Sequence, residues 1–411
     1  MGNPVLSFLS RDWAGLPVAA VVALLGGWCL RVGRASGGTG AAAVGTALLV
    51  VAGLLALGSV WHLVHVARTR ALHPPPGRLV DVGGYRMHVV AEGESGGKPS
   101  VVWMAGGHVG GFAIHHLHRM LREETRSILV DRPGTGWSDI GPFPRSTVRE
   151  AEEIFAALDA AGEKGPFVLV GHSFGGLLVA NMARRHPERL AGLVLLDPTP
   201  PDTIIYGPPL PGLFQMRYGA VLNALPRLFG FHTDFAGRRM RKTAPPVFKK
   251  VLDLVEERLG EAGRALRAID CGTKGACTSA SIYSELTPAG LARVGWDTTP
   301  YDGDLGDLPV ILVNPADMAE QELDYVVKTV ERQTGRPVDV NRLRRFYKGS
   351  MGRYLSCSSR AERAYAPAGT GHNFPYVEPE LIAGVVRRLL TPGVPVAAAP
   401  ANPGRAEGTA S

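Results

Sequence analysis

The five residues Gly171-His-Ser-Phe-Gly175 decide the fold of this chain. They follow the apolar run at residues 167–170, which predicts a buried strand, and precede residues 177–185, which predict a helix. A serine between two such glycines, after a strand and before a helix, is the G-x-S-x-G pattern of a nucleophile on a tight turn. Bulkier side chains two residues on either side of Ser173 would collide in so sharp a turn. The pattern therefore predicts that Ser173 projects from the sheet edge at a helix N-terminus, where the helix dipole favours a developing anion.

Other apolar runs on both sides of this turn predict a mostly parallel sheet. Short runs that do not alternate in polarity are typical of strands buried on both faces. Stretches with a helical period, such as residues 150–161, lie between them. This alternation indicates an α/β domain over residues 78–391. The expected strands span residues 86–90, 100–104, 127–130, 167–170, 193–196 and 310–313.

The N-terminal part of the chain differs from this domain in charge and hydropathy. The 411 residues carry a net charge of +7, and five of these positive charges lie within residues 1–80. Because the rest of the chain is close to neutral, we exclude a nucleic-acid-binding surface. Arginines flank two uncharged windows, residues 13–30 and 41–66, and a membrane-spanning helix needs about 20 apolar residues. A signal peptide would explain the first window alone, so we expect residues 1–72 to form a membrane anchor of two transmembrane helices.

The arginines also predict an orientation in the membrane, because positive residues concentrate on the cytoplasmic side of spanning helices. Two arginines lie between the windows and four lie on the side of residues 78–391, which mildly favours a cytoplasmic α/β domain. Residues 73–77, His-Pro-Pro-Pro-Gly, predict a stiff linker. The Pro- and Ala-rich residues 392–411 predict a disordered tail. Cys271 and Cys277 would pair only in an oxidising compartment, so their bonding stays open.

The motifs of residues 78–391 together resemble the α/β-hydrolase superfamily. Residues 131–138, Asp-Arg-Pro-Gly-Thr-Gly-Trp-Ser, are similar to a loop that precedes the nucleophile in that family. Residues 166–198 are similar to its nucleophile region and next strand, and Gly371-His-Asn-Phe374 to its catalytic-histidine loop. The resemblance implies an α/β-hydrolase fold, in which helices cover both faces of a mostly parallel sheet. It also implies that residues 199–305, which the sheet does not need, form a helical cap over the site.

The same resemblance implies a serine–histidine–acid triad. A serine hydroxyl is a poor nucleophile at neutral pH and needs a base that is itself oriented by an acid. The motif assigns Ser173 as nucleophile and His372 as base. Two positions are candidates for the acid. We favour Asp317, where the family commonly places it, although Asn314 stands where glycine is usual; Asp197, at the end of the preceding strand, is the alternative.

Acyl transfer also requires two N–H donors for the oxyanion. The resemblance implies the backbone N–H of Phe174 as the first donor. The second is expected from Gly107 or His108, in a loop where this chain has Ala105-Gly106 instead of the family's frequent His-Gly. No cysteine or paired carboxylate accompanies the histidines near this loop, so we expect neither a metal nor a cofactor. These histidines are His108, His115, His116 and His118.

These features predict a membrane-anchored serine hydrolase that cleaves a carboxylic ester or related acyl compound through an acyl-enzyme on Ser173. Its substrate would be a small-molecule or lipid ester. An iminopeptidase-like peptidase and an acyltransferase are alternatives with the same nucleophile. Serine at this position argues against epoxide hydrolase or dehalogenase chemistry, which uses aspartate there in this superfamily. A catalytically inactive membrane receptor or scaffold is the alternative from another class, and the oligomeric state is left open.

Overall fold

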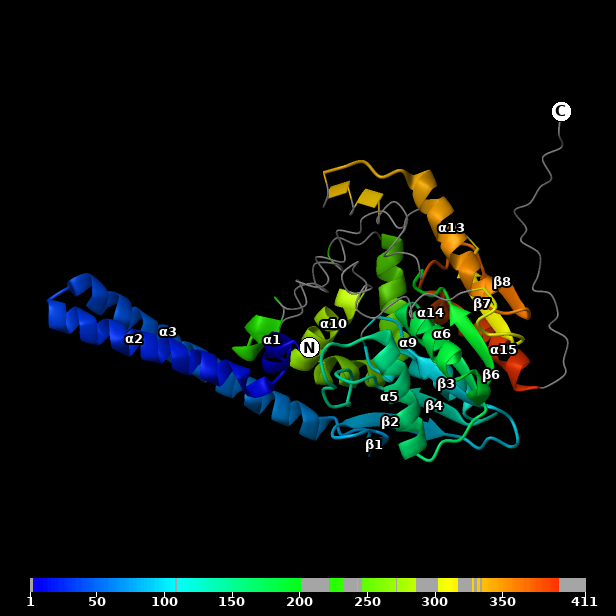
Figure 1. Cartoon of the computed structure of the whole chain (residues 1–411), viewed down its shortest axis with the longest axis horizontal. Coiled ribbons are helices and arrows are strands. Elements are labelled where there is room, and N and C mark those ends of the chain that lie inside the picture. Colours follow the sequence, from blue (N-terminus) through cyan, green and yellow to red (C-terminus); the bar gives the residue numbers. More distant parts are fainter. Residues whose placement is uncertain are drawn as a thin grey trace.

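A long helical hairpin projects from one side of an α/β domain (Figure 1). The structure is a computed structural model. Part of the expected cap, Cys271, Asp317, His108 and the expected tail at residues 392–411 lie outside the residues it describes. The described residues are 3–107, 109–200, 222, 224–232, 242, 246–270, 272–285, 302–316, 327–328, 331–332 and 335–391.

The α/β domain is built on one eight-stranded sheet with the order β1-β2-β4-β3-β5-β6-β7-β8. β2 pairs antiparallel with β1 and β4, and all other neighbours are parallel. Every expected strand is present, which confirms the α/β-hydrolase fold with its mostly parallel sheet. Two edge strands, β1 and β8, were not expected. The bounds are β1 (Arg78–Asp81), β2 (Arg86–Glu92), β3 (Ser100–Met104), β4 (Ser127–Val130), β5 (Phe167–His172), β6 (Leu190–Leu196), β7 (Val310–Pro315) and β8 (Ala361–Ala366).

Helices cover both faces of the sheet, so the central strands are buried on both sides. In β3, Val102 and Met104 belong to the core on one face, whereas Val101 and Trp103 belong to the core on the other. Full burial of one such side chain contributes about 1.5–3 kcal/mol. The first core is closed by α5 (Thr147–Ala160), α6 (Phe174–Arg185) and α13 (Val340–Ser356); the second by α4 (His115–Leu121), α14 (Phe374–Val377) and α15 (Pro379–Leu390).

Two helices are described within the expected cap, α9 (Pro246–Ile269) and α10 (Thr273–Glu285). α10 is tied to the α/β domain by Lys274, whose Nζ donates hydrogen bonds to the carbonyls of Gly136, at 2.5 Å, and Ser138, at 2.8 Å. Burial lowers the pKa of this lysine. Cys277, three residues after Lys274 in α10, is a buried free thiol.

The hairpin consists of α2 (Gly15–Ser36) and α3 (Thr39–Leu72), which are long and apolar enough to cross a membrane. The two backbones approach closely at Gly26 and Gly45, where a Cβ on Gly45 would lie 2.7 Å from the Gly26 carbonyl oxygen. Small residues permit this close packing in pairs of membrane helices. Large apolar side chains face outward along both helices, including Leu24, which is 75% exposed, and Leu57, which is 70% exposed.

The N-terminal segment packs on the α/β domain instead of being held away from it by the linker. Leu6 and Leu9 of α1 (Pro4–Leu9) share a buried cluster with Phe143 and with Cys277 of α10. On the linker side, the indole of Trp137 donates a hydrogen bond to the His73 carbonyl, at 2.8 Å. Both α1 and the linker therefore contact the rest of the chain. The helix α1 has only six residues, which are too few for a helical period of apolar positions to be recognised in the sequence.

We predict that Leu6→Ala lowers the stability of the folded chain by about 2 kcal/mol or more, because it removes a buried side chain from this cluster. Val5→Ala is the matched control, since Val5 is the preceding residue of α1 and is 62% exposed. Thermal unfolding of the full chain in detergent measures both. Equal midpoints for the two variants would show that α1 does not pack on the domain.

Candidate active site

Ser173 lies on a strained turn between β5 and α6. Its backbone has φ 55° and ψ −121°, a conformation that residues other than glycine rarely adopt. A Cβ on Gly171 would lie 2.3 Å from the Gly175 carbonyl oxygen, and one on Gly175 would lie 2.4 Å from the Met104 carbonyl oxygen. Both distances are too short for non-bonded atoms. The collision expected from the G-x-S-x-G pattern is thus confirmed.

The histidine and one acid candidate meet beside this turn. His372, in the turn before α14, has its Nδ1 2.6 Å from Oδ2 of Asp197. The backbone N–H of Ser173 donates to the Leu196 carbonyl at 3.0 Å, which holds the serine next to the end of β6 and hence next to Asp197. The other candidate, Asp317, lies outside the described residues. The observed contact places the alternative acid, Asp197, in position to orient His372.

Two further side chains form hydrogen bonds with the two residues of the His372–Asp197 pair. Asn314 Nδ2 donates to Asp197 Oδ1 at 3.1 Å, so the carboxylate is bound at both oxygens. His172 Nε2 donates to the backbone carbonyl of His372 at 3.0 Å. Burial lowers the pKa of His172 to about 3, so its ring is neutral at physiological pH. Sequence analysis noted Asn314 only as a departure from glycine and missed His172, because neither role leaves a sequence pattern.

The loop after β3 runs directly past the serine. A Cβ on Gly106 would lie 2.9 Å from Ser173 Cβ, so only glycine permits this approach. Gly107 has φ 55°, a conformation that favours glycine. Phe174 is the first residue of α6, on the other side of the serine. The structure therefore places Phe174, and Gly106 directly before Gly107, beside Ser173. The third expected oxyanion residue, His108, lies outside the described residues.

Two buried charged residues fix the conformation of this loop. Asp131 Oδ1 accepts a hydrogen bond from the Gly111 N–H at 2.6 Å, and the Arg132 guanidinium donates to the Gly107 carbonyl. Hydrogen bonds to charged groups are the strong ones. The sequence matched both residues to a family loop without assigning them a role. Their partners are about 20 residues away along the chain, and only the sheet brings them together.

The histidines of α4 take part in packing contacts. The Nε2 atom of His118 lies 3.1 Å from Glu92 Oε2. His116 Nε2 donates to the Pro375 carbonyl at 3.0 Å, which fastens α4 to the helix that follows His372. Burial lowers the pKa of His115 to about 4. Of these contacts, only that of His116 reaches the segment that follows His372.

Comparison with known proteins identifies the family. Residues 95–385 match the model of the family described as "Alpha/beta hydrolase family". The chain belongs to this family. The family supports a hydrolase, and the fold and the arrangement around Ser173 agree with it.

Individual relatives of this alpha/beta hydrolase match only part of the chain. "Uncharacterized protein YbdG" of Bacillus subtilis is 29% identical over 140 residues, which is 34% of this chain and 42% of that protein. A "Cis-3-alkyl-4-alkyloxetan-2-one decarboxylase" of Shewanella oneidensis is 31% identical over 117 residues, 28% of this chain and 36% of that protein. The chain thus spans less than half the length of these curated relatives. A solved thermophilic esterase from Thermogutta terrifontis has a TM-score of 0.48 at 16% identity, over 76% of this chain and 98% of the esterase.

The lowered pKa of His172 predicts a pH dependence of stability. Between about pH 3, its pKa in the folded chain, and the ordinary value of 6.5, the unfolded chain binds a proton that the folded chain does not. Stability therefore falls as the pH is lowered through this window, by up to about 1.4 kcal/mol per pH unit for this group. His172→Gln keeps an N–H donor but cannot titrate, so its stability should fall less steeply below pH 6.5. Urea unfolding between pH 8 and pH 4 measures the difference, and parallel curves would contradict it.

Proposed function

We propose that this alpha/beta hydrolase is a membrane-anchored serine hydrolase that cleaves a carboxylic ester or related acyl compound through an acyl-enzyme on Ser173. The observation that carries the proposal is the 2.6 Å contact between His372 Nδ1 and Asp197 Oδ2, beside a serine on a strained turn. A carboxylate at this distance fixes the imidazole with its proton on Nδ1, which assigns the role of the base to Nε2. We assign the role of the acid to Asp197.

The reaction would proceed in two balanced steps. His372 Nε2 takes the proton of the Ser173 hydroxyl while the serine oxygen attacks the substrate carbonyl. The N–H of Phe174 and a backbone N–H of the loop at Gly107 stabilise the oxyanion. The C–O bond to the alcohol then breaks, and His372 returns its proton to the departing alcohol. In the second step His372 removes a proton from water, and the water oxygen attacks the acyl-enzyme. The bond between the acyl carbon and the Ser173 oxygen then breaks, and His372 returns its proton to that oxygen, which releases the carboxylic acid and restores the Ser173 hydroxyl.

The membrane anchor is the second part of the proposal. The outward-facing apolar side chains of α2 and α3 have no counterpart in a water-soluble hairpin, and both helices are long enough to span a bilayer. An anchored active site would meet lipid esters at high local concentration. We propose that the catalytic domain lies on the cytoplasmic side, as the flanking arginines indicate.

The alternative enzymes differ from an esterase in the acceptor of the acyl group or in the bond that is cleaved. An acyltransferase passes the acyl group to an alcohol or amine acceptor, and an iminopeptidase-like enzyme cleaves an amide. Both would label at Ser173 with a fluorophosphonate, as an esterase does. A receptor or scaffold without activity would not label.

We predict that Ser173→Ala abolishes fluorophosphonate labelling and lowers ester hydrolysis by about 10⁴-fold or more. The reason is that alanine lacks the side-chain oxygen to which the acyl group would bind. Removing one hydroxyl should leave the unfolding temperature of the full chain nearly unchanged. Ser359→Ala, at an exposed serine, is the matched control and should label fully. Full hydrolysis of p-nitrophenyl esters by Ser173→Ala would rule out the mechanism.

We also predict that Asp197→Asn lowers kcat by about 10⁴-fold, because an amide at this position favours the wrong histidine tautomer. Asp317→Asn should have a far smaller effect. Steady-state kinetics on a short-chain ester, with the unfolding temperature measured in parallel, distinguish the two. The opposite ranking would assign the acid to Asp317.

A further inference from the structure

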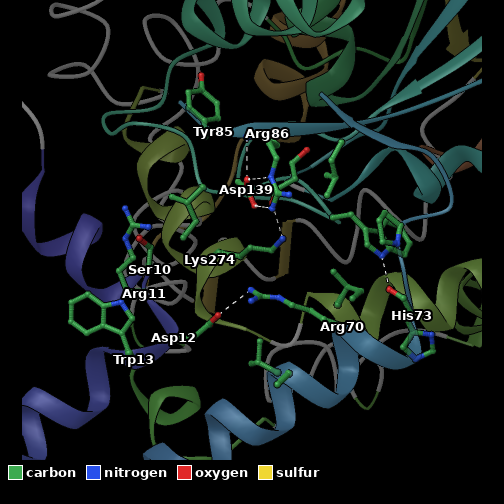
Figure 2. A pocket seen from close by; sticks show the side chains of 18 of the residues that line it. Ser10, Arg11, Asp12, Trp13, Arg70, His73, Tyr85, Arg86, Asp139 and Lys274 are labelled. Atoms are coloured by element: carbon green, nitrogen blue, oxygen red, sulfur yellow. Dashed lines mark hydrogen bonds and ion pairs between the residues drawn. The ribbon is translucent and has the colours of Figure 1, made fainter. Parts of the chain in front are cut away.

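A cavity of about 700 Å³ lies where the hairpin meets the α/β domain (Figure 2). One side is formed by the residues before α2 and by the end of α3, and the other by the turn after β1 and the loop at residues 137–140. Its volume is that of a small-molecule site. None of the three proposed triad residues is among its described lining residues, so the cavity is distinct from the active site.

The hairpin places this cavity at the level of lipid headgroups, if the anchoring proposed above is correct. From Trp13 to Arg31, α2 rises roughly 27 Å at 1.5 Å per residue, close to the bilayer core of about 30 Å. A Cβ on Gly15 would lie 2.3 Å from Ser59 Oγ, so Trp13 and Trp61 end at nearly the same depth. These two tryptophans are 50% and 56% exposed, and tryptophan is enriched at the membrane–water interface. Trp13 itself lines the cavity.

The polar side chains of the cavity carry a surplus of positive charge. Four cations, Arg11, Arg70, Arg86 and Lys274, line it against two carboxylates. Arg70 pairs with Asp12 at 3.0 Å and Arg86 with Asp139 at 2.9 Å, as Figure 2 shows. These pairs account for both carboxylates.

Arg11 is the cation that remains available for a ligand. Lys274 is buried and donates to two backbone carbonyls. Arg11 is exposed, and its guanidinium has no hydrogen bond or ion pair with any residue that the structure describes. The hairpin side of the cavity also carries an apolar strip, formed by Leu63, Val66 and Ala67 of α3.

We propose that this cavity binds the headgroup phosphate of an anionic glycerophospholipid. The phosphate contacts the Arg11 guanidinium, and Arg70, paired with Asp12, also lines the cavity. The acyl chains leave along Leu63, Val66 and Ala67 toward the bilayer. An apolar strip that leads from a cationic pocket into the membrane suits a lipid rather than a free anion, and the cytoplasmic leaflet supplies anionic lipids.

The test uses the full chain reconstituted in nanodiscs of phosphatidylcholine with or without phosphatidylglycerol. Native mass spectrometry counts the lipids that stay bound after release from the nanodisc. We expect retention of phosphatidylglycerol in preference to phosphatidylcholine. Arg11→Ala should reduce it about fivefold, the effect of one cation at an anionic membrane surface. Arg68→Ala is the matched control, because Arg68 is an exposed arginine of α3 that does not line the cavity, and it should retain the lipid.

Each other outcome overturns the proposal in a recognisable way. Equal losses in Arg11→Ala and Arg68→Ala would mean diffuse surface attraction, and no lipid preference in the unaltered chain would mean no site. Displacement of the bound lipid by millimolar inorganic phosphate would make this a free-phosphate site. Vesicle flotation of every variant is measured first. A chain that does not float lacks the proposed anchor, whereas a chain that floats without lipid selectivity keeps the anchor and lacks the site.

Discussion

The strained backbone at Ser173 is the constraint on which the site depends. A non-glycine residue at φ 55° costs about 1–3 kcal/mol and persists only where its surroundings hold it. Here the Ser173 N–H is bonded to the Leu196 carbonyl, and the Ser173 carbonyl accepts from the N–H groups of Gly176 and Thr199. The glycines at 171 and 175 remove the side chains that would prevent the turn. The turn places Ser173 at the end of β5, at the edge where the neighbouring parallel strands also end.

The parallel sheet then brings the remaining groups to the same place. The carboxyl ends of parallel strands lie at one edge of a sheet, which is where open α/β folds bind ligands. Asp197 follows β6, the neighbour of β5, and its N–H is bonded to the Val313 carbonyl of β7. Asn314, also on β7, reaches the carboxylate of Asp197. Asp197, the proposed acid, is thereby held by β7 in addition to its contact with His372.

The sequence predicts the elements that are buried and leaves open those that depend on neighbours. β3 and β4 agree with their expected bounds, because each is a continuous apolar run enclosed on both faces. β8 was missed because Ala-Glu-Arg-Ala-Tyr-Ala is a half-exposed edge strand without such a run. The choice of acid was open for a related reason. Asp197 and Asp317 both follow strands of the same sheet edge, and only the path of the His372 loop distinguishes them.

The loop at residues 131–139 connects the end of the molecule that carries the hairpin to the loop that passes Ser173. The indole N–H of Trp137 donates to the His73 carbonyl in the linker. The backbone N–H of Trp137 donates to Asp131 Oδ2 at 2.9 Å. The other oxygen of Asp131 holds Gly111, at the end of the loop that passes Ser173. A buried carboxylate that accepts hydrogen bonds on both oxygens cannot shift on one side without losing contacts on the other. Asp131 therefore links the linker after the hairpin, through Trp137, to the loop that passes Ser173. The loop therefore has a structural role, although none of its residues belongs to the proposed triad.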